Sequence, residues 1–135
     1  MSDLVRMTRA AFECLLAEAS ANPNIECCGL MAGRDGVISA VFPAKNALQS
    51  ATAYEIAPEE LFALFRRMRS EGLEHLGIYH SHPQGENFPS PSDLERAFYP
   101  DAAYFIVSQN AAVFRPIRAF RIREGRAREI LLELT

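Results

Sequence analysis

The chain has 135 residues, of which 49% are hydrophobic and 23% charged, and its formal net charge is −3. These values are typical of a soluble globular protein, and we expect one domain over residues 1–135. The charge balance gives no reason to expect nucleic-acid binding, and we expect neither a membrane-spanning segment nor a signal peptide. The three cysteines, two of them adjacent at Cys27 and Cys28, make a poor disulfide framework and favour a cytoplasmic location.

Helix and strand patterns alternate along the whole chain. In chain order they predict a helix over about 8–21, a hairpin of strands over 27–33 and 37–42, a short strand around 54–56, a helix over about 58–71, a strand over 75–80, a short helix over about 92–98, and strands over 103–108, 117–123 and 126–134. Thr8 suits the N-cap of the first helix, and Pro58 suits the first turn of the second. Strands interspersed with three helices predict an α/β or α+β fold with a mixed sheet.

The stretch HSHPQGENFPSPSD, residues 80–93, carries the residues best suited to catalysis. His80 and His82 are two residues apart, so on an extended strand both imidazoles project to the same side. Asp93 follows a Pro/Gly/Ser-rich loop and falls in the first turn of a helix that begins at Ser90. Two imidazoles and one carboxylate, with a fourth position left open, are the ligand set of a catalytic zinc. The stretch therefore predicts a hydrolytic zinc centre with one Zn²⁺ per chain.

Each of these residues also has a plain structural interpretation. An H-x-H pair often occurs by chance, and either histidine can be an ordinary surface residue. Ser90 suits an oxyanion donor and a helix N-cap equally well, so both roles stay open at this point. Cys28 is a conceivable fourth ligand, although simple burial of both adjacent cysteines is favoured. We assign no role to the third histidine, His75.

Hydrolysis of an amide also needs a carboxylate that transfers protons without being a metal ligand. Glu26 is the favoured candidate, because it follows the Asn-Pro-Asn helix break and opens the buried apolar strand CCGLM. Glu86, in the loop between the predicted ligands, is its nearest rival. A glutamate in such a loop is more often simply solvated.

Taken together, these residues make the sequence resemble the JAMM (MPN+) metalloprotease family. The pattern of that family is a glutamate, then H-x-H, seven residues and S-x-x-D, and Glu26, His80, His82, Ser90 and Asp93 match it without any departure in spacing. The resemblance implies that His80, His82 and Asp93 ligate zinc. It also implies that Glu26 activates the zinc-bound water as general base and acid, and that Ser90 stabilises the oxyanion.

The flanking sequence agrees with the same family over about residues 5–130, including GIYHSHP, the PxxN segment at 43–46 and AYFIVS. The resemblance implies a mixed sheet flanked by helices, similar to that of cytidine deaminases. Members of the family hydrolyse peptide or isopeptide bonds after the C-terminal glycines of ubiquitin-like proteins. The chain has no long insertions between its predicted elements, which favours the compact prokaryotic type.

For this type the resemblance implies a zinc-dependent metallo(iso)peptidase whose protein substrate is a ubiquitin-like or β-grasp sulfur carrier ending in diglycine. We expect the tail to enter as an extended strand beside a sheet edge or loop, with residues 43–53 lining its groove. The sequence indicates neither the identity of the carrier, nor the kind of bond, nor the oligomeric state.

Three other functions are weighed against this interpretation. Zinc-dependent base deamination requires H-x-E with P-C-x-x-C, and the sequence has neither. A RadC-like protein shares the HxHP…PS-x-x-D stretch, but it usually carries an N-terminal helical DNA-binding region, which we do not expect before Met7. A non-catalytic MPN scaffold that only binds partners is the alternative of a different class. Such scaffolds have lost metal ligands, whereas this sequence contains all three predicted ligands and Glu26.

Overall fold

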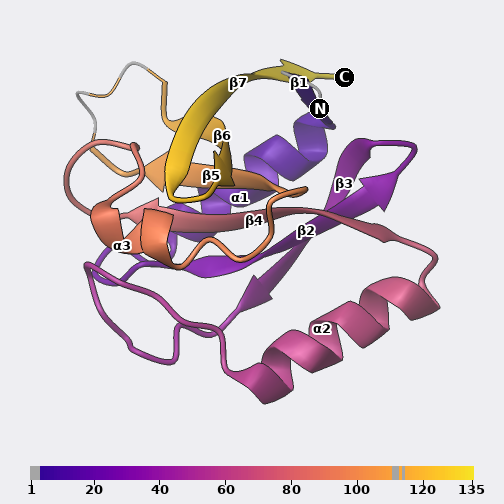
Figure 1. The fold of residues 1–135 in the computed structure, drawn as a ribbon, viewed down its shortest axis with the longest axis horizontal. Coiled ribbons are helices and arrows are strands. Elements are labelled where there is room, and N and C mark those ends of the chain that lie inside the picture. The colour runs from indigo at the N-terminus through magenta and orange to yellow at the C-terminus, as the bar shows by residue number, and fades with distance from the viewer. Residues whose placement is uncertain (1–3, 111–112, 114) are drawn as a thin grey trace.

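The computed structural model describes residues 4–110, 113 and 115–135, and that part of the chain contains three helices and seven strands. In chain order the elements are β1 (Leu4–Met7), α1 (Arg9–Ser20), β2 (Cys28–Arg34), β3 (Val37–Ala44), α2 (Pro58–Ser70), β4 (Glu74–His82), α3 (Pro91–Glu95), β5 (Ala103–Ser108), β6 (Ile117–Arg123) and β7 (Arg126–Leu134). Figure 1 shows their arrangement, with α1 and α2 on different sides of the strands.

The seven strands form one sheet that closes on itself in the order β1-β3-β2-β4-β5-β6-β7. β2 pairs antiparallel with both β3 and β4, whereas β4 and β5 run parallel. β1 closes the ring because it pairs in parallel with both β3 and β7. The predicted mixed sheet with three helices is confirmed. Its closure through β1 is a feature that the sequence did not predict.

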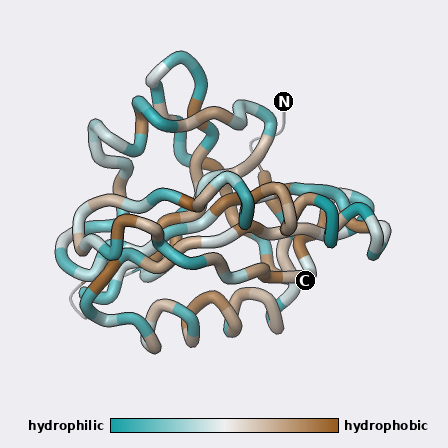
Figure 2. The backbone as a smooth tube through the Cα atoms, turned by 90° about the horizontal axis from the view of Figure 1, so that it is seen from below, coloured by the Kyte–Doolittle hydropathy of each residue, from teal (hydrophilic) through white to brown (hydrophobic). Residues whose placement is uncertain are grey.

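The central strands are covered on both faces, so their side chains divide between two apolar clusters. On one face, Tyr79 of β4 and Phe105 of β5 pack in the cluster that contains the buried side of α1. The residues next to them in sequence, Ile78 and Tyr104, point the opposite way and pack in the cluster that contains Met68 of α2. All six residues of β5 are buried, as expected for a strand with both faces covered. In Figure 2 the hydrophobic segments accordingly gather in the central strands.

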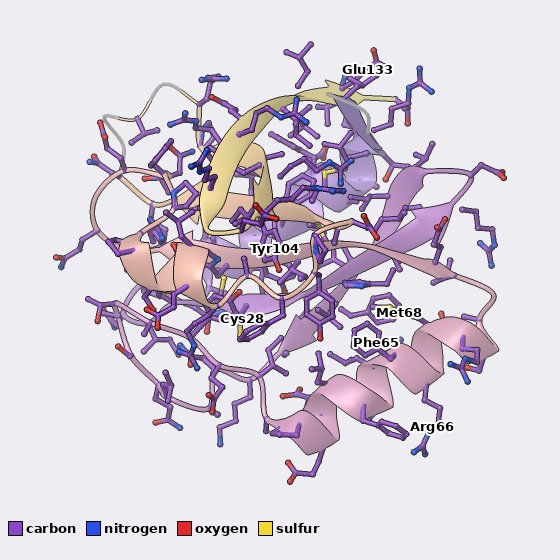
Figure 3. All side chains as sticks on the ribbon, in the orientation of Figure 1. Cys28, Phe65, Arg66, Met68, Tyr104 and Glu133 are labelled. Atoms are coloured by element: carbon purple, nitrogen blue, oxygen red, sulfur yellow. The ribbon has the colours of Figure 1, made fainter. Side chains whose placement is uncertain are left out.

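The two longer helices begin as the sequence predicts. The Thr8 hydroxyl accepts a hydrogen bond from the Ala11 backbone N–H at 3.1 Å, which satisfies one free donor at the start of α1. Pro58 opens α2, and Phe65 and Met68 point from that helix toward the strands while Arg66 points away (Figure 3). Of the helices in the described part of the chain, none is long and apolar enough to cross a membrane.

One predicted strand is absent, and one predicted helix is shorter than expected. No strand forms at 54–56, because the backbone N–H of Glu55 donates to Asn46 Oδ1 at 3.3 Å and its carbonyl accepts from the Ala47 N–H at 2.8 Å. These local bonds replace a sheet ladder. The third helix ends at Glu95 instead of reaching residue 98, and the N–H of Tyr99 donates to the hydroxyl of Tyr104 at 2.9 Å.

Candidate metal centre

The predicted ligands converge at the end of β4. His80 and His82 follow Ile78 at every second position of the strand, so all three side chains leave the same face. The Nε2 atoms of the two histidines lie 3.1 Å apart. Asp93, in the first turn of α3, places its Oδ2 atom 3.1 Å from Nε2 of His80 and 3.2 Å from Nε2 of His82. Three possible ligand atoms therefore surround one point.

The dimensions of this triangle fit a metal ion. Ligand atoms bound about 2.0–2.1 Å from a tetrahedral zinc lie roughly 3.3–3.4 Å from one another. The observed separations of 3.1–3.2 Å need only a small outward adjustment to reach that geometry. Among the residues that the structure describes, His80, His82 and Asp93 form the one cluster of histidine, cysteine and acidic side chains that could hold a metal ion. Two imidazoles and one carboxylate leave a coordination position open.

The charge states of these groups also suit a cation. Burial lowers the pKa of His80, which favours the neutral imidazole that ligates metals. Burial would raise the pKa of Asp93, but hydrogen bonds with His80 and His82 hold it well below its usual range. Burial acts to lower the pKa of His82 as well, but its bonds to the Asp93 carboxylate and the Glu86 carbonyl raise it overall. The cluster thus combines an ionised carboxylate with a buried neutral imidazole.

The two imidazoles are oriented by different contacts. His82 donates from Nδ1 to the Glu86 carbonyl at 2.7 Å, so in the neutral imidazole the lone pair of Nε2 faces the cluster. The ring of His80 instead stacks on Tyr54, with 4.6 Å between ring centroids and 22° between the planes. Its Nδ1 atom is buried and has no hydrogen-bond partner among the described residues. Packing therefore fixes His80, and a backbone hydrogen bond fixes His82.

The loop between the ligands is anchored at two points, one in the segment before β6 and one at the end of β5. Asn87 is 1% exposed, and its amide donates to the Arg115 carbonyl at 2.6 Å. The Ser108 hydroxyl, at the end of β5, donates to the Gly85 carbonyl at 2.9 Å. Gly85 has φ +90°, a conformation that favours glycine. These anchors hold the Glu86 carbonyl against His82.

Glu26 reaches the cluster from the strand next to β4. Cys28 is the cross-strand partner of His80, and the antiparallel pairing continues because the Ser81 N–H donates to the Cys27 carbonyl at 3.0 Å. One further step along the same register places Glu26 opposite His82, on the same face of the sheet.

The environment of the Glu26 carboxyl is unusual for an acid. Glu26 is 3% exposed, and its Oε1 atom has no hydrogen-bond partner in the described part of the structure. Burial raises its pKa to about 7, while nearby His82 lowers the pKa and nearby Asp93 raises it. Glu26 lies outside the cluster of possible ligand atoms. The structure thus brings an uncompensated carboxyl near the cluster without adding it as a ligand.

Ser90 is the N-cap of α3. Its hydroxyl oxygen accepts from the Asp93 N–H at 3.1 Å, and its own backbone N–H donates to Asp93 Oδ2 at 2.8 Å, which completes a capping box. The capping interpretation is therefore confirmed. The hydroxyl hydrogen is not consumed by this cap, because Ser90 Oγ acts in it only as an acceptor.

The other candidates lie outside the cluster. The side chain of Glu86 is exposed, so only its backbone carbonyl takes part. Cys27 and Cys28 are buried, as the favoured interpretation predicted, and neither belongs to the group of possible ligands. His75, near the start of β4, lies with its Nε2 3.0 Å from the Gly77 carbonyl and contacts the ring of Phe65 edge-on.

Sequence reasoning missed two residues that support the site, Tyr54 and Asn46. The sequence predicts a strand at Tyr54, but in the structure its ring is the stacking partner of His80. Asn46 is 3% exposed, and its side chain bonds several backbone groups of the loop between β3 and α2. The PxxN segment at 43–46 was the only signal for Asn46, and the sequence held no signal for the stacking of Tyr54.

Comparison with known proteins agrees with this geometry. The chain belongs to the prokaryotic homologues of the JAB domain, whose family model matches residues 8–123. It is 38% identical to the desampylase of Haloferax volcanii over 93 residues. This aligned stretch covers 67% of each of the two chains. It is 32% identical to the CysO-cysteine peptidase of Mycobacterium tuberculosis over 117 residues. This aligned stretch covers 85% of this chain and 80% of the relative.

Among solved structures, protein DSY2949 of Desulfitobacterium hafniense matches with a TM-score of 0.85 at 33% identity, over 97% of this chain and 92% of that one. The JAMM-type family and fold expected from the sequence are thus confirmed. The chain is a hydrolase of this class.

Proposed function

We propose that the chain is a zinc-dependent metallo(iso)peptidase that cleaves the peptide or isopeptide bond after the C-terminal glycines of a ubiquitin-like, β-grasp sulfur-carrier protein. The observation that carries the proposal is the pairing of a three-ligand cluster with a buried carboxyl, Glu26, whose oxygen has no partner in the described structure. The names of the two relatives, desampylase and CysO-cysteine peptidase, support the substrate class.

In this proposal His80, His82 and Asp93 hold one Zn²⁺ per chain. The donor set suits that ion, since zinc accepts imidazole nitrogen and carboxylate oxygen in a tetrahedral site with one position left open. A zinc ion held there would lower the pKa of a bound water to about 7, which would make that water a nucleophile for an amide carbonyl at neutral pH.

Glu26 acts as the general base and general acid of the reaction. Its carboxylate accepts a proton from the attacking water and then gives it to the nitrogen of the leaving amine. A pKa of about 7 suits both halves of this cycle, because a general acid–base group works best when its pKa lies near the operating pH. Among the described residues Oε1 has no hydrogen-bond partner, which supports the role, since a carboxyl bound in a salt bridge would be a weaker base.

Ser90 stabilises the developing charge. Its hydroxyl donates a hydrogen bond to the carbonyl oxygen of the scissile bond as that oxygen becomes negative. The cap supports this role, because the Asp93 N–H fixes the position of Ser90 Oγ at 3.1 Å while the hydroxyl hydrogen stays free to point elsewhere. One side chain then serves the helix and the reaction together.

The test is cleavage of a β-grasp protein extended past its C-terminal glycines, with zinc content measured on the same preparation. We expect one zinc per chain, hydrolysis that stops with 1,10-phenanthroline, and recovery on addition of Zn²⁺. Asp93→Ala should lose both metal and activity, whereas Glu95→Ala, an exposed acid on the same helix, should keep both. Absence of stoichiometric zinc, together with an unchanged rate in Asp93→Ala, would contradict the proposal.

A further inference from the structure

An apolar pocket of about 300 Å³ opens beside the metal centre. Leu30, Ile78 and Tyr104 come from the adjacent strands β2, β4 and β5 and are all buried. Leu61 of α2 adds to the wall, and Phe98, after α3, borders the pocket with 73% of its surface exposed. A large exposed aromatic next to an apolar hollow is a feature of recognition surfaces.

The pocket is continuous with the cluster of candidate ligands. Asp93 lines it, and so does Tyr54, whose ring stacks on His80. Ile78, in the same wall, lies two residues before His80 on the same face of β4. A chain that lies across the metal centre therefore passes directly over this pocket.

Charge at the pocket is internally balanced. Glu55 and Arg96 both line it, and they pair with each other at 2.7 Å between Glu55 Oε1 and Arg96 Nη2. The carboxylate of Asp93 is already engaged by the two histidines and the Ser90 N–H. The pocket thus offers apolar surface without a free charge on Glu55, Arg96 or Asp93, and it favours an uncharged, apolar occupant.

A second hollow, of about 190 Å³, borders Glu26 and indicates which way a substrate lies. Its lining includes the polar residues Glu18, Asn22 and Lys45, and it shares no lining residue with the apolar pocket. In the proposed function Glu26 gives a proton to the leaving amine, so the amine must depart on the side of Glu26. The acyl part of the substrate, which ends at the scissile carbonyl, then lies toward the apolar pocket.

We propose that the apolar pocket receives the side chain of the residue immediately before the C-terminal glycines of the carrier protein, and that it selects carriers by this residue. The inference rests on the proposed function. Glycines have no side chain to fill a pocket, and two extended residues span about 7 Å, so the preceding residue is the first that can enter. The volume suffices for a leucine or phenylalanine side chain, since a cavity of about 150 Å³ already accepts a benzene ring.

The test uses a β-grasp protein ending in X-Gly-Gly followed by a fluorescent reporter, where X is Leu, Ala or Asp. For the wild-type enzyme we expect kcat/KM to be about tenfold higher for Leu than for Ala and about a hundredfold higher for Leu than for Asp. Leu61→Phe places a larger side chain in the pocket, so it should lower the Leu-to-Ala ratio to one or below. Ala63→Phe makes a similar addition on an exposed position of the same helix and should leave the ratio unchanged.

The carriers ending in free X-Gly-Gly provide a second readout that needs no hydrolysis. Their Kd values, measured by fluorescence anisotropy for wild type and both variants, should follow the same order of X. Equal kcat/KM and equal Kd for all three carriers would overturn the inference. The inference would also be overturned if Leu61→Phe changed the preference for the residue after the scissile bond and left the preference for X unchanged. If the proposed function is wrong, no carrier is cleaved. The order of the Kd values for carriers with Leu, Ala or Asp at X still shows whether the pocket selects X.

Discussion

Asn46 and Glu26 are joined by a buried hydrogen bond, in which the Asn46 amide donates to the Glu26 carbonyl at 2.9 Å. The same amide donates to the Ala53 carbonyl at 2.9 Å, and Asn46 Oδ1 accepts from the Glu55 N–H at 3.3 Å. One side chain therefore connects the residue proposed to transfer protons with the loop that carries Tyr54 onto His80.

Removing this amide should disturb catalysis more than metal binding. Asn46→Ala leaves the Glu26 and Ala53 carbonyls without a donor, which costs about 2–4 kcal/mol of unfolding free energy. We expect a lower melting temperature and a rate of hydrolysis reduced at least tenfold, with zinc affinity changed much less, because the side chain of Asn46 bonds the backbone groups of residues 26, 48, 53 and 55. Asn24→Ala removes an exposed amide near Glu26 and serves as the control. Equal losses of zinc affinity and rate would show that Asn46 only maintains the fold.

The raised pKa of Glu26 makes the stability of the metal-free protein depend on pH. Its folded-state pKa of about 7 exceeds the ordinary value of 4.5, so the folded protein holds this proton more tightly than the unfolded chain does. The stability that the protonated group contributes is therefore fully present below about pH 4.5 and is lost as the pH rises through about 7, a loss of about 3 kcal/mol.

Glu26→Gln should remove that loss. In zinc-free buffer we expect the variant to melt at a higher temperature than wild type at pH 8 and at a similar temperature at pH 5, measured by calorimetry. If the difference in melting temperature between Glu26→Gln and wild type is the same at pH 5 and pH 8, the pKa of Glu26 is not raised in the folded protein. Water would then solvate its carboxylate.

The same variant separates proton transfer from metal binding. Glu26→Gln should keep one zinc per chain and lower hydrolysis by about a hundredfold to ten-thousandfold, which is the usual contribution of a general acid–base group. Glu86→Gln, in the exposed loop, is the matched control and should retain nearly full activity. Loss of zinc from Glu26→Gln would instead make Glu26 a ligand.

Two substitutions distinguish the cap from the oxyanion donor at Ser90. Ser90→Ala loses both functions, whereas glycine is tolerated at an N-cap at a cost of only a few tenths of a kcal/mol. We expect hydrolysis to fall tenfold to a thousandfold in both variants, but the melting temperature to fall mainly in Ser90→Ala. If Ser90→Gly hydrolyses the substrate at the wild-type rate, Ser90 is a cap alone.

Asn87 should influence zinc affinity without touching a ligand. Its amide anchors the loop whose Glu86 carbonyl accepts from His82 Nδ1, and partners of this kind typically change metal affinity by about 10- to 100-fold. We expect Asn87→Ala to raise the zinc Kd by about tenfold in competition with a chromophoric chelator. Gln84→Ala, exposed in the same loop, should leave the Kd unchanged.

The parts of the site that depend on local spacing could be predicted from the sequence. His80 and His82 share a face because a strand alternates with a period of two, and Asp93 joins them because Ser90 and Pro91 start a helix. Glu26 was predicted with less support, because its position opposite His82 depends on the pairing of β2 with β4, which the sequence does not display.

The parts that depend on distant contacts could not be predicted. β1 spans four of the residues that the structure describes, and it forms because it lies between β3 and β7, whose positions the sequence does not reveal. The segment 54–56 has strand-forming residues, but Asn46 bonds its backbone and prevents pairing. The apolar pocket is likewise assembled from strands, two helices and a loop that meet only in the fold.

The candidate ligands come from one continuous stretch between residues 80 and 93, whereas Glu26 arrives only when β2 docks against β4. The ligand set is therefore local in sequence, whereas the position of the proposed proton-transfer carboxyl depends on the pairing of β2 with β4. In the proposed mechanism, a chain in which β2 is not paired with β4 lacks Glu26 at the metal centre, so we expect it not to hydrolyse the substrate.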